Sequence, residues 1–284
     1  MRASLSLLLP TILPVICLAG LSACVIEPAK PYTALASPDD IRQRTDTVTN
    51  LPVLNLIPRA DQREQGDSAA AANLVGYRRQ GYDVFDANNA QQDPRFDRLS
   101  EIFTKVQARS HLADEYLRPV LVERDEFQAY TNGGTVIIFY TGLTETLSDD
   151  ALAMVIGHEI AHLAAGHVAE QSSRDLVNTD NHAGLGGPSL LGSYSIGNEH
   201  EADAVGMVYA ALAGYDPAAA AAIWKALSVN GDDRLKMFNH SHPSDSERAR
   251  VLAEKAVLAQ ELRGAENWQN VRDCNPIYCA TKND

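Results

Sequence analysis

Apolar residues follow helical spacing over several stretches of the chain, and two shorter runs between them are typical of strands. Over residues 93–110 the apolar side chains form one stripe of a helix, which the Asp93-Pro94 pair would begin. Residues 116–125 and 135–141 predict strands, the second because it is rich in β-branched and aromatic side chains.

The second half of the chain is predicted to be almost entirely helical. A Ser-Asp-Asp sequence at 148–150 caps an apolar helix that continues to about residue 171. A loop rich in Gly, Asn and Ser follows over 178–198, and a helix of small residues then ends at Gly214. The last predicted helix is amphipathic and lies within residues 238–263. The pattern therefore predicts a mostly helical α+β fold with one small sheet.

Composition and charge narrow the class of protein. The chain has 284 residues, of which 45% are hydrophobic and 21% charged, an ordinary globular balance that can bury one good core. Its formal net charge of -13 argues against a nucleic-acid partner, because phosphate binding requires clustered Lys and Arg. We therefore expect no nucleic acid among its partners.

The N-terminal residues predict an export signal. Arg2 precedes an apolar stretch that is short and contains two prolines, which disfavours a stable membrane helix. The Leu-Ser-Ala-Cys sequence that ends at Cys24 resembles the bacterial lipobox, which implies cleavage before Cys24 and membrane attachment through lipid on it. Val25 replaces the usual aspartate retention signal, so this resemblance implies a lipoprotein on the periplasmic face of the outer membrane of a Gram-negative bacterium. A plain signal peptide with an incidental cysteine is the alternative.

The chain is divided into a signal peptide, a lipid-anchored tether, a main domain and a tail, which we place at residues 1–23, 24–70, 71–264 and 265–284. In the tail, Cys274 and Cys279 are expected to form a disulfide, because an exported protein meets an oxidising compartment. A zinc ribbon would need two further cysteines nearby, and the sequence has none there.

The sequence VIGHEIAHLAAGH at 155–167 carries the strongest chemical signal. His158 and His162 lie about 40° apart around the predicted helix, so both imidazoles can reach one ion. Glu159 flanks the same face and can address a water on that ion. Two imidazoles, a carboxylate and an open position suit zinc. His167 lies about 180° from His158 on a continuous helix, so we expect it at the surface or at a helix cap.

The third ligand is expected on a second element, and the sequence NEHEADAVG offers four candidates: Glu199, His200, Glu201 and Asp203. Asp203 follows Glu199 by one turn, so this pair provides a ligand and a second carboxylate that accepts an imidazole N–H. Glu201 points to the opposite side of the helix. We therefore predict Glu199 as the ligand and Asp203 as the residue that orients an imidazole. Small residues on the same face permit close approach of the first helix: Ala202, Gly206 and Ala210.

Together these motifs resemble the HtpX/CAAX-prenyl-protease-like family of gluzincin zinc metallopeptidases, and within it the soluble periplasmic BepA-like branch. The resemblance covers about residues 90–262. It implies a zincin-like domain with a small sheet beside the HExxH helix, with His158, His162 and Glu199 as zinc ligands and Glu159 as general base. It also implies that the strand near residue 135 borders the substrate cleft and pairs with an extended peptide through Thr135, Val136, Ile137 and Ile138. The chain ends too early for the C-terminal helical-repeat domain of that branch, so its docking role is not expected.

A His-Pro loop completes the resemblance. In the BepA-like branch the histidine of such a loop can approach the zinc and block it, which places His242 near the metal and Arg248 behind it. Once displaced, His242 can also stabilise an oxyanion, and His240 is a nearby competitor without the proline. The alternative is a loop in which Ser244 or Asp245 only caps a helix.

The resemblance implies a zinc-dependent endopeptidase of the bacterial cell envelope that hydrolyses internal peptide bonds in misfolded or misassembled envelope proteins. In that reaction Glu159 takes a proton from water and gives it to the leaving amine. Two alternatives lack catalysis: a lipid-anchored chaperone-like protein with a closed, structural zinc site, and a scaffold for outer-membrane assembly. A zinc amidase that acts on cell wall is a further alternative, because HExxH does not fix the substrate.

Overall fold

The computed structural model describes residues 44–45, 48, 52–88, 93–181, 194–219, 223, 241–242 and 246–265. Several predicted features lie outside the described residues, namely the signal peptide, Cys24, most of the 178–198 loop, His240, Cys274 and Cys279. At the N-terminal end of the described part, two short strands pair antiparallel, β1 (Arg44–Thr45) and β2 (Pro52–Val53).

A four-stranded mixed sheet lies at the centre of the fold, in the order β3-β4-β6-β5. Its strands are β3 (Val84–Phe85), β4 (Arg118–Val122), β5 (Ala129–Thr131) and β6 (Val136–Tyr140). β4 and β6 are parallel, and the two outer pairings are antiparallel. Both strands predicted from β-branched and aromatic runs are present, and the mostly helical α+β class is confirmed.

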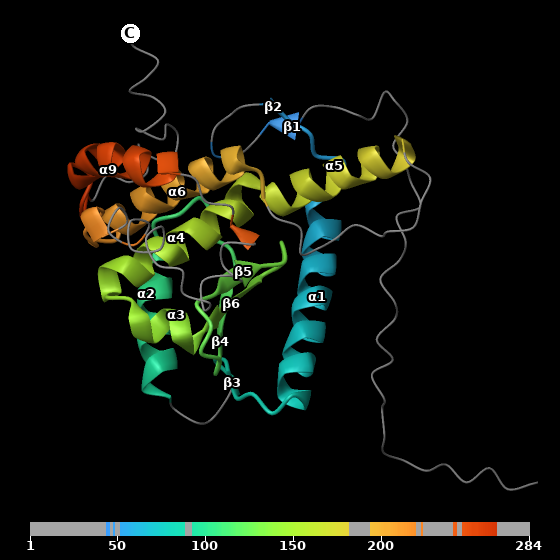
Figure 1. The fold of residues 1–284 in the computed structure, drawn as a ribbon, viewed down its shortest axis with the longest axis horizontal. Coiled ribbons are helices and arrows are strands. Elements are labelled where there is room, and N and C mark those ends of the chain that lie inside the picture. Colours follow the sequence, from blue (N-terminus) through green and yellow to red (C-terminus); the bar gives the residue numbers. More distant parts are fainter. Residues whose placement is uncertain are drawn as a thin grey trace, which may run out of the picture. The chain divides into compact units, whose positions relative to one another are not determined.

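Helices cover both faces of this sheet (Figure 1). One face carries Ile137 and Phe139 of β6 and joins the main core, which α2 (Pro94–Gln107) and α4 (Asp149–Ala165) complete. The other face carries Val136, Ile138 and Tyr140 and packs with Ala70 of α1 (Arg59–Arg79). Side chains alternate across the pleat, so a strand covered on both sides must be apolar at every position, as β6 is.

The predicted substrate edge is therefore wrong. Val136, Ile137 and Ile138 belong to β6, which pairs with β4 on one side and β5 on the other, and Thr135 lies just before it. The edge next to β6 is formed by β5, whose three residues gave no clear strand signal. A long, wholly apolar run marks an interior strand, because an edge of that kind would invite aggregation.

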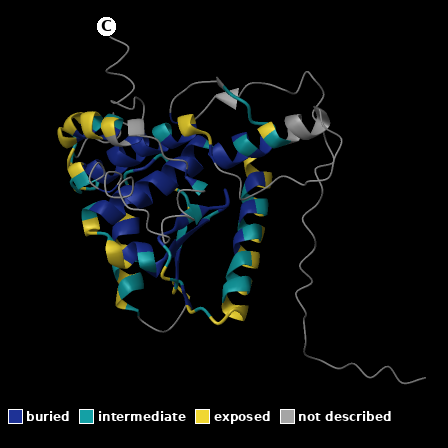
Figure 2. Ribbon diagram, viewed as in Figure 1, coloured by how far each residue is buried: buried dark blue, intermediate teal, exposed yellow. Residues whose placement is uncertain are grey.

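Helix α4 is the buried centre of the helical layer, as its dark blue ribbon in Figure 2 shows. Ser148 caps it, with its Oγ accepting a hydrogen bond from the Ala151 amide at 3.3 Å. Helices α2 and α6 (Ile196–Leu212) pack against α4, and α9 (Ser246–Gln260) packs against α6. The short α3 (Thr141–Thr146) follows β6 directly. This packing brings residues from distant parts of the chain close to the histidines of α4.

The apolar helix predicted to reach residue 171 breaks earlier. Gly166 ends α4 in the left-handed conformation, with φ of 75°, and α5 (His167–Asn181) begins at the next residue. Glycine adopts this conformation without the steric cost that other residues meet, so it terminates helices. No single helix of the described part is long and apolar enough to cross a membrane. Only α4 with the start of α5 passes such a test as a pair bent by 55°, and α4 is buried.

The tether predicted for residues 24–70 ends earlier than expected, because α1 already begins at Arg59. This helix is polar around most of its surface, so its sequence lacks a clear apolar stripe. It docks through a few apolar side chains of its C-terminal half and, nearer its start, by close backbone approach and polar contacts. A Cβ on Gly66 would lie 2.1 Å from the Gly134 amide nitrogen, and Asp67 Oδ1 accepts a hydrogen bond from the Thr135 amide at 2.7 Å.

This docking gives a matched pair of substitutions within α1. Gly66→Ala is expected to lower the free energy of unfolding by about 1–3 kcal/mol, because the added methyl must push the helix away from the β5–β6 turn. Gly76→Ala, where a Cβ meets nothing within 4 Å, is expected to raise it by about 0.5–1 kcal/mol through helix propensity. Equilibrium urea unfolding measures both. Equal effects of the two substitutions would contradict the docking geometry.

Candidate metal centre

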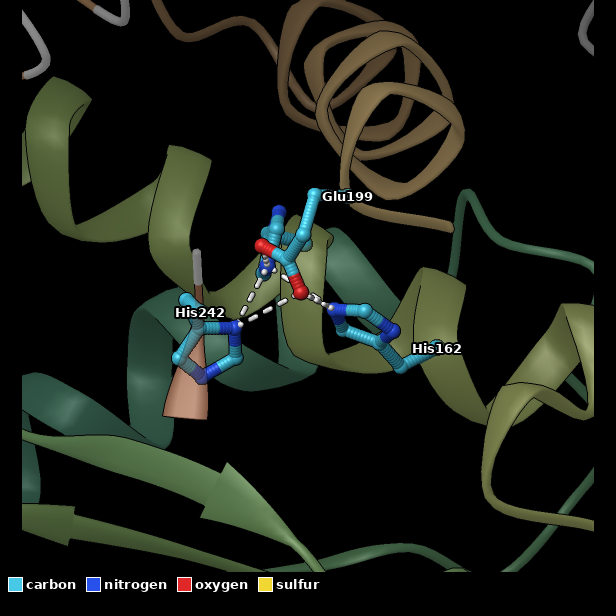
Figure 3. A group of neighbouring side chains, drawn as sticks. His162, Glu199 and His242 are labelled. Atoms are coloured by element: carbon cyan, nitrogen blue, oxygen red, sulfur yellow. Dashed lines mark hydrogen bonds and ion pairs between the residues drawn. The ribbon is translucent and has the colours of Figure 1, made fainter. Parts of the chain in front are cut away.

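Four buried side chains converge on one point beside α4 (Figure 3). They are His158 and His162 of α4, Glu199 of α6 and His242, and each offers one ligand atom within 4.8 Å of the others. His158 Nε2 lies 2.9 Å from His162 Nε2 and 3.5 Å from Glu199 Oε2. His242 Nδ1 lies 3.2 Å from His158 Nε2 and 3.3 Å from Glu199 Oε1. The structure thus brings together the residues predicted as ligands, with His242 as a fourth donor.

The close crossing of α4 and α6 makes this convergence possible. A Cβ on Gly157 would lie 2.3 Å from the Gly206 carbonyl oxygen, and one on Gly206 would lie 2.4 Å from the His158 amide nitrogen. Two glycines in contact let the helix backbones approach until Glu199 reaches the imidazoles. The small residues predicted to permit this approach are buried at the crossing.

Widening this crossing should damage the site. Gly206→Ala is expected to lower the free energy of unfolding by about 1–3 kcal/mol and to weaken metal binding, because the new methyl overlaps the α4 backbone. Gly197→Ala in the same helix is the control, since its Cβ would meet only Ser195 Oγ, at 3.7 Å. Urea unfolding and metal titration measure the two effects. Wild-type behaviour of Gly206→Ala would show that the crossing tolerates more space.

Asp203 lies behind His158, as predicted for an orienting carboxylate. His158 Nδ1 lies 2.9 Å from Asp203 Oδ1, which leaves Nε2 directed at the ligand cluster. The carboxylate neighbours also act on protonation. Burial lowers the pKa of His158, but Asp203 and Glu199 outweigh it and raise the pKa to about 10, whereas burial holds the pKa of His162 well below its usual value. A cation that binds here must displace the proton from His158.

Arg248 supports both carboxylates from α9. Its Nε and Nη2 donate to Asp203 at 2.8 and 2.9 Å, and its Nη1 lies 3.0 Å from Glu199 Oε2. The side chain is fully buried. Burial would raise the pKa of Asp203, but Arg248 and His158 bring it below its usual value. Arg248, predicted behind His242, therefore fixes two acidic groups of the site.

Glu159 lies within the same cluster and is also fully buried. Within the described residues, neither of its carboxylate oxygens accepts a hydrogen bond, and His242 Nε2 lies 3.4 Å from its Oε1. Burial raises the pKa of this carboxyl group. A buried carboxylate without hydrogen bonds is costly, which indicates a functional group held ready for a proton.

The donor set and its charge fit a divalent cation. Once His158 has given up its proton to bind a metal, the three buried carboxylates of Glu159, Glu199 and Asp203 are balanced by one buried guanidinium among the described residues, that of Arg248. The negative charge in excess is unfavourable in a dry interior unless a cation balances it. Two imidazoles and a carboxylate are the donors that zinc prefers.

Two further neighbours of His162 were not predicted. The Tyr194 ring stacks on its imidazole at 3.9 Å between centroids with an interplanar angle of 15°. His167 was expected at the surface or at a helix cap. It begins α5, but it is not at the surface, because it is 2% exposed and its Nδ1 lies 2.8 Å from His162 Nδ1. Glu201 is not among the converging ligand atoms, and its Oε2 lies 3.7 Å from His167 Nε2. The sequence signal that could have revealed the position of His167 was Gly166, which ends the helix just before it.

An HExxH helix that receives a glutamate from a second helix beside a small sheet defines the gluzincin class of metallopeptidase domain. The family model of peptidase family M48 matches residues 93–188 and 181–256, and the chain belongs to this family.

Named relatives agree with this class. The chain is 32% identical over 181 residues to "Mitochondrial metalloendopeptidase OMA1" of Arabidopsis thaliana, which covers 56% of the chain and 36% of that protein. It is 32% identical over 168 residues to the protein of the same name from Schizosaccharomyces pombe, covering 51% and 50%. It is 27% identical over 148 residues to "Metalloprotease LoiP" of Escherichia coli, covering 46% and 59%. The matches thus span less than two thirds of each relative's length.

These relatives correct the predicted localisation. The plant and fission-yeast relatives are mitochondrial proteins, as are those from Bos taurus and Saccharomyces cerevisiae. The placement as a lipoprotein on the periplasmic face of the outer membrane is therefore wrong. It depended on a lipobox-like sequence of a few small residues before Cys24, a short pattern that says little about location.

Proposed function

We propose that this protein is a zinc-dependent endopeptidase that hydrolyses internal peptide bonds of unfolded or misassembled polypeptides. One observation carries the proposal. Glu159 is a buried carboxylate that accepts no hydrogen bond from the described residues, and it adjoins a cluster of two imidazoles and Glu199 that suits zinc. The relatives named as metalloendopeptidases and as a metalloprotease support the same reaction. We also propose that the protein belongs to the BepA-like branch and that its substrates are proteins of the cell envelope.

The residues divide the work of hydrolysis. His158, His162 and Glu199 would hold zinc, which when bound supplies Lewis acidity that activates water and polarises the scissile carbonyl. Glu159 takes the proton of the attacking water on a carboxylate oxygen and passes it to the leaving amine nitrogen. Its raised pKa favours holding that proton between the two steps. Asp203 and Arg248 keep the ligands oriented throughout.

The substrate backbone is proposed to pair with the edge of β5 rather than with β6. Ala129 of β5 directs its carbonyl oxygen at the site, where it lies 3.3 Å from His242 Nε2. A second contact joins the same segments, since Gln128 Nε2 donates to Ser241 Oγ at 3.1 Å. An extended peptide on this edge would need the hydrogen-bonding groups that residues 241–242 now use. His242 must therefore move before a peptide binds at Ala129.

Removing His242 tests this arrangement. His242→Ala is expected to raise the cleavage rate, because it opens a coordination position and frees the Ala129 carbonyl. The gain would be about tenfold if the present arrangement holds about nine-tenths of the population. Steady-state cleavage of an unfolded protein by the zinc-loaded variant measures it. A lower rate would instead assign His242 a role in stabilising the oxyanion.

The fourth donor also favours one alternative function. Four protein ligands would close the coordination of zinc, as in structural sites. In that case the protein acts as a chaperone-like or scaffold protein. Stoichiometric zinc without any cleavage, in the wild type and in His242→Ala alike, would support this alternative.

The decisive experiment uses the full chain. The protein is stripped of metal with a chelator and reloaded with zinc, and each form is incubated with an unfolded protein substrate. We expect new internal fragments, identified by mass spectrometry, only after zinc is restored. Fully zinc-loaded protein that yields no fragments contradicts the proposed function.

A further inference from the structure

The chain turns at Gly166, and this turn places the side chain of His167 back against α4. On a continuous helix His167 would point away from His158. The break lets its ring meet that of His162 at 4.9 Å between centroids and 74° between planes. The contact is buried, with His162 and His167 exposed by 0% and 2%. The proposed reaction leaves His167 without a role.

The chemistry of this contact fixes which atoms carry hydrogen. His162 directs Nε2 at the ligand cluster, where it lies 3.4 Å from Glu199 Oε1, so Nδ1 must carry its hydrogen when Nε2 binds a metal. Nδ1 then donates to Nδ1 of His167, at 2.8 Å. His167 then carries its hydrogen on Nε2, and the Glu201 carboxylate lies near that atom, at 3.7 Å, a longer distance than a hydrogen bond. The arrangement is a pair of hydrogen-bonded imidazoles that ends at the metal ligand, with a carboxylate close behind it.

We propose that His167 is a positioning residue for the metal centre, which holds the tautomer and ring orientation of His162. The inference rests on the proposed zinc site. The two histidine ligands then have different supports. His158 is held by a carboxylate, that of Asp203, and His162 is held by a neutral imidazole.

The difference has an electrostatic reason. Glu159, Glu199 and Asp203 already place three buried carboxylates around the site. A further carboxylate in contact with His162 would add to the buried charge, which is costly without another cation. An imidazole accepts the Nδ1–H and adds no charge. Tyr194, stacked on the His162 ring, restricts the same ring further.

The test compares substitutions that keep or remove the acceptor. In the full chain, His167→Leu is expected to raise the zinc dissociation constant by about 10- to 100-fold, the usual effect of losing a partner of a metal-bound histidine. His167→Asn is expected to restore most of the affinity, because its amide oxygen lies near the place of Nδ1. His167→Gln carries its amide one bond farther, near the place of Nε2, and should bind zinc less tightly than His167→Asn. Competition with a chromophoric chelator measures the affinities, and the visible spectrum of the cobalt-substituted protein reports the ligand geometry.

The control is His111→Leu, which removes a histidine that contacts Tyr209 of α6 through Nδ1, at 2.5 Å. It should leave zinc affinity and the cobalt spectrum unchanged. The proposal is overturned if His167→Leu binds zinc within about twofold of the wild type. It is also overturned if His167→Asn and His167→Gln bind zinc equally, a comparison that holds even where His167→Leu fails to fold. None of these readouts requires peptide cleavage. A protein that binds zinc as expected but cleaves nothing would contradict the proposed function and leave the role of His167 intact.

Discussion

Glu159→Gln is expected to keep the metal and to lower the turnover number for peptide cleavage by about 10²- to 10⁴-fold, the usual contribution of a general base. Glutamine has nearly the shape of glutamate but cannot take a proton from water. Glu159 lies outside the pairs that hold Asp203 and Arg248, so the ligand geometry should survive. The substitution also removes a buried carboxylate that has no hydrogen bond within the part of the chain that the structure describes, so the variant should unfold at an equal or higher urea concentration.

The measurement pairs zinc content with turnover on an unfolded protein. Glu64→Gln is the matched control, because Glu64 is an exposed glutamate of α1 on the outer surface. It should show wild-type zinc content and turnover. Full activity of Glu159→Gln would show that another group accepts the proton. Loss of zinc from this variant would contradict the prediction that Glu159 acts as the base and is not a zinc ligand.

Arg248→Met is expected to cost about 3–5 kcal/mol of unfolding free energy, because it leaves two buried carboxylates without their cation. The guanidinium contacts Asp203 through two nitrogens and Glu199 through the third. Without the guanidinium, the carboxylates of Glu199 and Asp203 are no longer held in place, so zinc affinity should fall as well. Arg248→Lys keeps the charge but not the planar fork and should recover only part of both.

Urea unfolding in the presence of a chelator isolates the protein's own stability, and zinc titration follows separately. Arg250→Met on the same helix is the control, because Arg250 is exposed and pairs with Glu254 at the surface. Its unfolding free energy should stay within about 0.5 kcal/mol of the wild type. If Arg248→Met is as stable as this control, the contacts of Arg248 with Asp203 and Glu199 do not stabilise the fold.

Local patterns predicted the two longer strands, the helices around the metal centre and its two histidine ligands. The cap at Ser148, the apolar run of β6 and the spacing of His158 and His162 each depend on residues a few positions apart. Such features follow from helix and strand periodicity alone. The choice of Glu199 with Asp203 also used helical spacing, and the structure places both beside the histidines.

Patterns failed where a decision depended on packing between distant segments. The α1 helix has little apolar character, so only its contact with the β5–β6 turn reveals why it is ordered. The interior place of β6 depends on β5, which is only three residues long. His167 was misplaced because one glycine redirects the chain by 55°.

By itself, the sequence determined the class of fold, the helix that carries HExxH, and the identity of the chemical groups, because periodicity and caps act within a few residues. The family resemblance placed His242 near the metal, but only the tertiary structure decided which atoms meet. Arg248 pairs with Asp203, 45 residues away, and His242 lies beside His158, 84 residues away. Contacts over such separations depend on how closely distant segments pack, as where two glycines at the crossing of α4 and α6 let Glu199 reach the histidines.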